Sequence, residues 1–125
     1  MFWDDFSLLE KEMNQFENYL QEVLASKEPL IEGAINNLAQ AGGKRVRPAL
    51  VIATAHFGEY DKKQVWQIAA AVEIMHMATL IHDDIIDDSD LRRGHKTVQA
   101  EYGKDVAVFT GDYLFTLTFD ILSGS

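Results

Sequence analysis

Apolar residues recur at alternating spacings of four and three along residues 2–24, at Phe2, Phe6, Leu9, Met13, Phe16, Leu20 and Val23. This spacing predicts an amphipathic helix with one apolar seam. We favour a helix that packs on its own bundle over a coiled-coil dimerisation arm. Ser26, as a cap, and Pro29 then predict a second helix that begins near the proline. Its buried face is expected to carry Leu30, Ile31, Ala34, Ile35 and Leu38.

The second helix is expected to end at Gly42-Gly43, where the first glycine can adopt the left-handed conformation of a C-terminal cap. Basic residues cross the gap in the segment KRVR, and Pro48 opens a third helix that ends near Gly58. Because Arg47 precedes a proline, its backbone is expected to be extended. The pattern therefore predicts a break between two helices that carries basic side chains.

The longest predicted element is a central helix over Lys63–Asp88, which follows a polar turn. Apolar residues cover nearly all of its sides, at Ala69, Ala70, Ala71, Val72, Ile74, Met75, Ala78, Leu80 and Ile81. A helix that is apolar all round must be surrounded by other helices.

The last part of the chain reads as a loop over residues 94–97, a helical turn over 98–102 and a helix over 106–122. That helix is expected to be kinked or restarted at Gly111-Asp112. No β-alternation of useful length is present, so the class is all-α, with about five helices. Since the central helix needs more cover than four neighbours supply, we expect residues 1–125 to be the N-terminal portion of one larger helical domain.

Composition narrows the function classes. The 125 residues include no cysteine, which excludes disulfides, zinc–thiolate sites and thiol catalysis. The formal net charge of -9 argues against a nucleic-acid binder, which needs a basic face. Five of the eleven basic residues are nevertheless gathered in two short clusters, an arrangement that suits a small anion: Lys44, Arg45, Arg47, Arg92 and Arg93.

No targeting segment is visible at the N-terminus, which is acidic and lacks the basic start and apolar run of a signal peptide. The apolar run over residues 68–81 contains Glu73 and His76, and it is too short and too polar to span a bilayer. We therefore expect a cytoplasmic protein without a transmembrane segment.

Acidic residues accumulate at the end of the central helix. Five of the twenty Asp and Glu residues lie within positions 83–90, where the helix terminus already carries partial negative charge. Asp83 and Asp87 are four residues apart, and Asp84 and Asp87 are three apart, so their carboxylates can project from one face and share metal ions. Hard oxygen ligands of this kind suit Mg²⁺. The alternative is a solvated acidic cap that only ends the helix.

The segment GGKRVRP is the second informative stretch. Lys44 and Arg47 flank the break between helices, so both side chains can turn into one cleft. There the lysine would supply a point charge and the arginine a planar, forked guanidinium for phosphate oxygens. It is not a Walker loop. The alternative is a glycine-capped helix with solvated basic residues. His76 lies seven residues before Asp83 on nearly the same helix face, and it is either a cleft residue or a satisfied core histidine.

These motifs resemble those of the trans-type polyprenyl diphosphate synthases. HDDIIDDSDLRRG is similar to the first aspartate-rich motif of that family, and GGKRVRP is similar to its upstream basic motif. The segments EIMHMATLIHDD and GDYLF add to the resemblance, which runs from about Pro29 to the C-terminus. Within the family the chain resembles medium- and long-chain members, such as those that make heptaprenyl diphosphate. The implied fold is the isoprenoid synthase helical bundle, of which this is the N-terminal half.

The resemblance implies a reaction and roles for the residues. The family condenses isopentenyl diphosphate with an allylic diphosphate through Mg²⁺-assisted ionisation. By resemblance, Asp83, Asp84 and Asp87 are the catalytic, metal-binding acids, and Arg92 contacts the allylic diphosphate. The residues expected to hold the diphosphate of isopentenyl diphosphate are Lys44, Arg47, His76 and Arg93.

The chain departs from the family in one respect. The family's second aspartate-rich motif and its lysine-containing stretch belong to the C-terminal half, and neither occurs in these 125 residues. We therefore expect little catalysis by this chain alone. The family also implies a homodimer of helical bundles, although some long-chain members pair with an unrelated small subunit.

Product length is a further expectation from the resemblance. The growing tail descends from the aspartates along the central helix, where Thr79 and Ala78 are small and Met75 could form a lower constriction. We expect a product longer than farnesyl, and Ala78→Phe should shorten it. The alternative is that these residues are small for helix packing.

Three other functions would use some of these residues. A terpene cyclase also uses such an aspartate motif, but it has no need for Lys44 and Arg47. A metal-dependent phosphohydrolase of the HD type would use His56 and His82-Asp83, but it leaves Asp84, Asp87 and the double arginine without roles. A non-catalytic partner subunit of a prenyl synthase fits the short chain, but such a subunit should have lost the aspartates.

Overall fold

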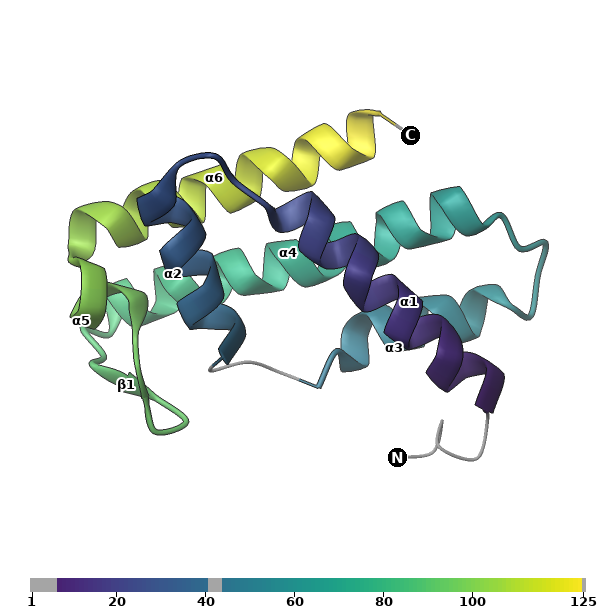
Figure 1. The fold of residues 1–125 in the computed structure, drawn as a ribbon, viewed down its shortest axis with the longest axis horizontal. Helices are drawn as coiled ribbons and strands as arrows, with labels where there is room; N and C mark the ends of the chain where they lie inside the picture. The colour runs from purple at the N-terminus through teal and green to yellow at the C-terminus, as the bar shows by residue number, and fades with distance from the viewer. Residues whose placement is uncertain (1–6, 41–43, 125) are drawn as a thin grey trace.

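The computed structural model describes residues 7–40 and 44–124. Six helices account for nearly all of the regular structure in this part of the chain (Figure 1), which confirms the all-α class. They are α1 (Ser7–Leu24), α2 (Pro29–Gln40), α3 (Val46–Ala55), α4 (Lys62–Ile86), α5 (Val98–Tyr102) and α6 (Lys104–Ser123). A hairpin of two short strands, not predicted from the sequence, joins α4 to α5 through β1 (Leu91–Arg92) and β2 (His95–Lys96).

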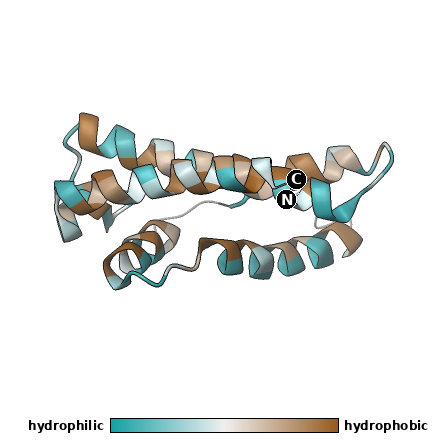
Figure 2. Cartoon of the chain, turned by 90° about the horizontal axis from the view of Figure 1, so that it is seen from above, coloured by the Kyte–Doolittle hydropathy of each residue, from teal (hydrophilic) through white to brown (hydrophobic). Residues whose placement is uncertain are grey.

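Helix α4 lies at the centre of the molecule, with α6 running alongside it. Figure 2 shows α1 and α2 in a second layer, with the hydrophobic residues of α1 turned towards α4. Phe16 and Leu20 are fully buried there, and the Phe16 ring meets Trp66 edge-on at 5.8 Å between centroids. The prediction that this helix packs on its own bundle is confirmed for Ser7–Leu24. Phe2 and Phe6 lie outside the described residues.

Helix α2 begins at Pro29, as predicted. The turn before it is held by the Ser26 backbone N–H, which donates to Glu32 Oε2 at 2.7 Å. Ala34, Ile35 and Leu38 are buried and Ile31 is partly buried, but Leu30 is 54% exposed, so its predicted burial is wrong. At 100° per residue, Leu30 lies about a quarter turn from the centre of the buried stripe, at its edge.

Helix α3 begins at Val46, two residues before the predicted start. Its N-cap is Arg45, which adopts the left-handed conformation (φ 56°, ψ 34°). Arg47 is helical, so the expectation of an extended backbone is wrong. Pro48 sits in the first helical turn, where its missing N–H costs no intrahelical bond, and the helix can therefore form around it. The predicted end of α2 at Gly42-Gly43 lies outside the described residues.

Helix α4 confirms the predicted central element but ends at Ile86 rather than Asp88. Asp61 caps its start, since its side chain accepts a hydrogen bond from the Gln64 N–H. Asp88 has a left-handed backbone (φ 52°), and this conformation ends the helix. The cover of α4 is incomplete, because Ile68 and Val72 remain exposed along one side.

Helix α6 is continuous from Lys104 to Ser123, so the predicted kink or restart at Gly111 is wrong. Gly111 is required by packing rather than by a turn. A Cβ atom at this position would clash with the imidazole ring of His82 on α4. The outer side of α6 carries exposed apolar side chains, at Val108, Phe109, Phe119 and Leu122.

Helices α4 and α6 are both long and apolar enough to cross a membrane by length and composition alone. The expectation that residues 68–81 are too short and too polar to span a bilayer does not extend to the whole of α4. A core helix passes the same test, and α4 has 56% of its apolar window buried in the bundle. The two helices are therefore weak evidence for a span.

Candidate active site

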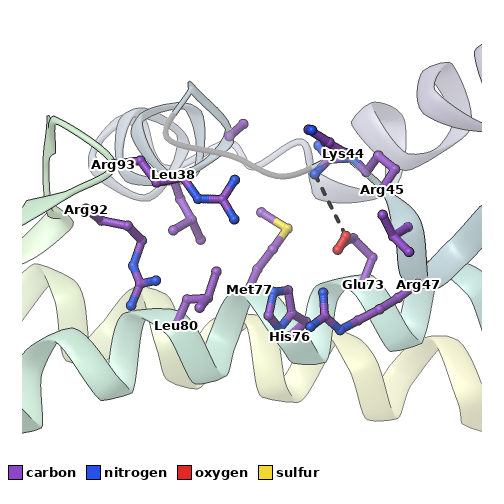
Figure 3. A pocket seen from close by; sticks show the side chains of 12 residues that line it. Leu38, Lys44, Arg45, Arg47, Glu73, His76, Met77, Leu80, Arg92 and Arg93 are labelled. Carbon is purple, nitrogen blue, oxygen red and sulfur yellow. Dashed lines mark ion pairs between the residues drawn. The ribbon is translucent and has the colours of Figure 1, made fainter. Parts of the chain in front are cut away.

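A cavity of about 390 Å³ lies along one face of α4, between the end of α2, the segment before α3 and the hairpin. Figure 3 shows the side chains that line it. Both basic clusters reach it, although they are far apart in sequence. The structure brings together every residue predicted to bind a diphosphate, namely Lys44, Arg47, His76, Arg92 and Arg93.

The charge of the cavity is strongly positive. Five basic side chains line it, against the one acid Glu73. Burial, followed by the charge of Arg47, lowers the pKa of His76 below its ordinary value of 6.5, and Glu73 only partly opposes this. His76 is therefore a neutral imidazole at neutral pH, able to donate and accept hydrogen bonds. This balance of charge suits a small, highly charged anion.

Arg45 and Glu73 line the same cavity. Arg45 belongs to the first basic cluster predicted to suit an anion, whereas no role at the site was predicted for Glu73. Arg45 Nε donates to Glu17 Oε1 on α1 at 2.8 Å, and Arg45 Nη1 lies 3.9 Å from Glu73 Oε2. Glu73 is only 3% exposed, and the described residues give its Oε2 no hydrogen-bond partner. An acid in the middle of an apolar helix was the sequence signal for this residue.

The three acids predicted to share metal ions lie in two different environments. Asp84 is 6% exposed and forms a two-point ion pair with Arg92, with Nη2–Oδ1 at 2.7 Å and Nε–Oδ2 at 3.1 Å. This hydrogen bonding raises the pKa of Arg92 above its ordinary value. Asp83 and Asp87 are exposed.

The loop that carries Arg92 is held to the end of α4 by a buried glutamine. Gln99 Nε2 donates to the backbone carbonyls of Asp84 at 2.8 Å and of Ser89 at 2.7 Å. Thr97 Oγ1 also donates to the Ser89 carbonyl. These bonds fix the turn after α4, and they therefore fix the approach of the hairpin to the cavity.

The exposed pair Asp83 and Asp87 fits a hard divalent cation. Asp87 caps α4 with near-helical dihedral angles (φ -84°, ψ -4°), so the spacing of one helical turn to Asp83 is kept. Neither side chain forms an ion pair with any described residue, and two carboxylates completed by phosphate oxygens are typical of Mg²⁺ binding. Within residues 7–40 and 44–124, no group of three or more His, Asp or Glu side chains is arranged to hold a metal without such additional oxygens.

The three residues predicted to set product length also lie in different environments. Thr79 is exposed, one turn before Asp83, and Met75 is half-buried. Ala78 is fully buried. It lies four residues before His82, on the side of α4 that faces α6, where His82 packs on Phe115 at 5.0 Å between ring centroids.

The two histidines of a phosphohydrolase site do not share an environment. His56 contacts Glu12 of α1 at 2.8 Å and stacks on Tyr60, whereas His82 packs against α6. This arrangement gives that alternative no support.

Comparison with known proteins agrees with the fold. The solved heptaprenyl diphosphate synthase from Staphylococcus aureus matches with a TM-score of 0.86 and 39% identity, over 92% of this chain and 37% of that one. The geranylgeranyl pyrophosphate synthase from Lactobacillus brevis matches with a TM-score of 0.87 and 38% identity, over 97% of this chain and 38% of that one. The bundle is therefore that of the isoprenoid synthases.

The polyprenyl synthetase family model matches residues 28–125. The heptaprenyl diphosphate synthase component 2 of Geobacillus stearothermophilus is 44% identical over 116 residues, which cover 92% of this chain and 36% of that protein. The chain belongs to the polyprenyl synthetase family. It spans about a third of the length of the curated relatives it matches.

Proposed function

We propose that this chain contributes the diphosphate-binding half of a prenyltransferase site. The reaction condenses isopentenyl diphosphate with an allylic diphosphate to give a trans-polyprenyl diphosphate. The observation that supports it most is that both basic clusters and His76 line one cavity along α4. The relatives include proteins named geranylgeranyl diphosphate synthase and prenyl transferase, which also supports the proposal.

In this proposal the site binds two diphosphate groups, one from each substrate. Lys44, Arg47, His76 and Arg93 hold the diphosphate of isopentenyl diphosphate, with arginine forks matching pairs of phosphate oxygens and the lysine adding a point charge. Arg92, which lies between the cavity and the acids at the end of α4, contacts the allylic diphosphate.

Asp83 and Asp87 would hold Mg²⁺, which supplies positive charge where the leaving diphosphate develops negative charge. The allylic C–O bond breaks, and the electron pair leaves with the diphosphate. The double bond of isopentenyl diphosphate then forms the new C–C bond to the allylic carbocation. The released diphosphate takes the proton lost from the product, so the chain needs no side-chain base. The apolar residues of the bundle exclude water from the cation.

We further propose that residues 1–125 form the N-terminal portion of a larger helical domain. The exposed apolar sides of α4 and α6 support this, as does the length of the relatives. Thr79 and Ala78, with Met75 below them, would then set product length. We place the protein in the cytoplasm, where its charged substrates are dissolved.

The assembly is proposed to be a dimer, with two candidate forms. The family resemblance favours a homodimer. A heteromer is favoured by two relatives that are each named component 2 of a heptaprenyl diphosphate synthase. In either form this chain supplies the acids, which would be superfluous in a subunit without catalytic residues.

The test is a prenyl transfer assay on the protein that contains this chain together with the remainder of its domain. Lys44→Gln and Arg47→Gln should raise the KM for isopentenyl diphosphate, while Asp83→Asn should lower kcat. Lys63→Gln removes the same charge from an exposed position outside the cavity and is the matched control. Equal KM values for Lys44→Gln and Lys63→Gln would contradict the assignment.

A further inference from the structure

Two buried acids lie on the cavity side of α4. Glu73 and Asp84 are eleven residues apart, about three helical turns, and they therefore project from nearly the same face some 16 Å apart. Both are almost inaccessible to solvent. Each forms an ion pair with an arginine of a different basic cluster, Glu73 with Arg45 and Asp84 with Arg92.

The pair at the first end of the cavity fixes the segment before α3. Arg45 is a non-glycine residue in the left-handed region, a conformation that must be held by its surroundings. Its guanidinium bridges Glu17 on α1 and Glu73 on α4, as the dashed line to Glu73 in Figure 3 shows in part. Lys44 and Arg47 flank this anchored residue, so their positions depend on it.

The pair at the second end fixes the hairpin. Both hydrogen bonds of the Asp84–Arg92 pair are of charge-assisted type and in fork geometry, which is the strongest orientation an arginine can be given. Arg93 follows directly and lines the same cavity. Asp84 therefore sets the position of the second basic cluster relative to α4.

We propose that Glu73 and Asp84 are positioning residues. Because both project from α4, their fixed spacing along this helix sets the separation of the two basic clusters. Neither of them binds the diphosphate or the metal. This inference rests on the proposed function, because it concerns the same diphosphate site. It gives Asp84 the role of holding Arg92, whereas the exposed acids Asp83 and Asp87 remain available for the metal.

The sign of one substitution effect separates this role from a simple charge effect. Neutralising an acid in a cationic cavity makes the cavity more positive, which by itself strengthens binding of an anion. Loss of a positioning contact weakens binding instead. The isosteric variants Glu73→Gln and Asp84→Asn therefore give opposite results under the two accounts.

The experiment is isothermal titration of the protein that contains this chain together with the remainder of its domain, with inorganic diphosphate in the presence of a chelator, so that no metal contributes. We expect Asp84→Asn to weaken binding about tenfold, the size of one lost charge-assisted contact. Glu73→Gln should weaken it by a smaller factor, because the 3.9 Å ion pair of Glu73 with Arg45 is not a hydrogen bond. Glu59→Gln, which neutralises an exposed acid outside the cavity, is the matched control and should change little. Unchanged or tighter binding by Glu73→Gln and Asp84→Asn would overturn the proposal.

A double-substitution cycle shows whether Asp84 acts through Arg92. Asp84→Asn should have no further effect on diphosphate affinity when Arg92→Gln is already present. Full additivity of the two effects would contradict the pairing. If an isosteric variant loses its helical circular dichroism, Glu73→Asp and Asp84→Glu replace them. These variants keep the charge, so weaker binding supports positioning and unchanged binding overturns it.

Failure of the proposed function gives a different result. A wild-type chain that binds no diphosphate would contradict that function. The Asp84–Arg92 pair is then read from the Arg92 Nε–H signal in ¹⁵N NMR. This signal should be protected from exchange in the wild type and lost in Asp84→Asn, and an unprotected wild-type signal would overturn the pair.

Discussion

Asp83 and Asp84 are adjacent in the sequence, yet their carboxylates have different partners. Asp84 is buried in an ion pair with Arg92, while Asp83 is exposed and forms no ion pair with any described residue. The difference follows from helix geometry, since neighbouring residues project 100° apart. Within the aspartate-rich segment, Asp84 therefore stabilises the hairpin through Arg92, whereas Asp83 is available to bind a metal ion.

This division predicts unequal effects on metal binding. Asp83→Asn should weaken Mn²⁺ binding in the presence of diphosphate by about tenfold or more, because it removes a direct ligand of a divalent ion. Measured at saturating diphosphate, Asp84→Asn should change Mn²⁺ affinity by less than about threefold. Electron paramagnetic resonance of free Mn²⁺ measures both. An equal loss in the two variants would mean that Asp84 is a ligand.

His76 should titrate below the ordinary histidine value in the free protein. Burial and the charge of Arg47 lower its pKa, so the folded state binds fewer protons than the unfolded chain at acidic pH. The resulting contribution to stability is complete above about pH 6.5 and is lost as the pH falls below it. NMR of the His76 ring protons measures the midpoint. Diphosphate should raise this midpoint, and a free-protein midpoint at or above 6.5 would contradict the site electrostatics.

Glu12 should be important for attaching α1 to the bundle. Its carboxylate accepts hydrogen bonds from Tyr60 Oη, from Trp66 Nε1 at 2.9 Å and from His56 Nε2 at 2.8 Å. Burial raises the pKa of Glu12, but these hydrogen bonds outweigh it and the net pKa is lowered. Burial, followed by the hydrogen bond to Glu12, raises the pKa of Tyr60 to about 12.

Glu12→Gln should therefore lower the free energy of unfolding by about 1–3 kcal/mol at neutral pH, the cost of an ionised acceptor lost from a partly buried site. The difference from the wild type should shrink as the pH falls below about 4.5, because the lowered pKa makes this stability depend on the ionised form. Urea unfolding followed by circular dichroism measures it. Glu10→Gln, at an exposed position of the same helix, is the control. Equal stabilities of the two variants would refute the role.

Product length should respond to Thr79 more cleanly than to Ala78. Thr79 is exposed on the side of Asp83, so a phenylalanine there can enter the path of the growing chain without disturbing the core. Ala78→Phe should also shorten the product, but it overpacks a fully buried position and should cost about 1–3 kcal/mol of stability. Mass spectrometry of products from the complete synthase decides this. Unchanged product length in both variants would contradict the proposed path.

The helices could be predicted from the sequence because periodicity is a local property. The seam through Phe16 and Leu20 gave α1 its buried face, and Pro29 gave α2 its start. Features that depend on a neighbouring helix were not predictable in this way. Gly111 looked like a break, although it is a helical residue whose missing side chain makes room for His82.

The site was predictable for a different reason. Its motifs carry the residue types that a diphosphate requires, and Lys44, Arg47, His76 and Arg93 do line one cavity. The pairing of Asp84 with Arg92 was not predictable, because an acid at a helix end can face a metal or an arginine. Only the position of Arg92 beside Asp84 distinguishes the two.

The most direct test of the account is equilibrium binding of isopentenyl diphosphate to the protein that contains this chain together with the remainder of its domain, with Lys44→Gln and Arg47→Gln compared with the control Lys63→Gln. The account predicts saturable binding that inorganic diphosphate displaces and that each cavity variant weakens about tenfold or more. Binding that is insensitive to both cavity substitutions would contradict the assignment of this cavity to a diphosphate.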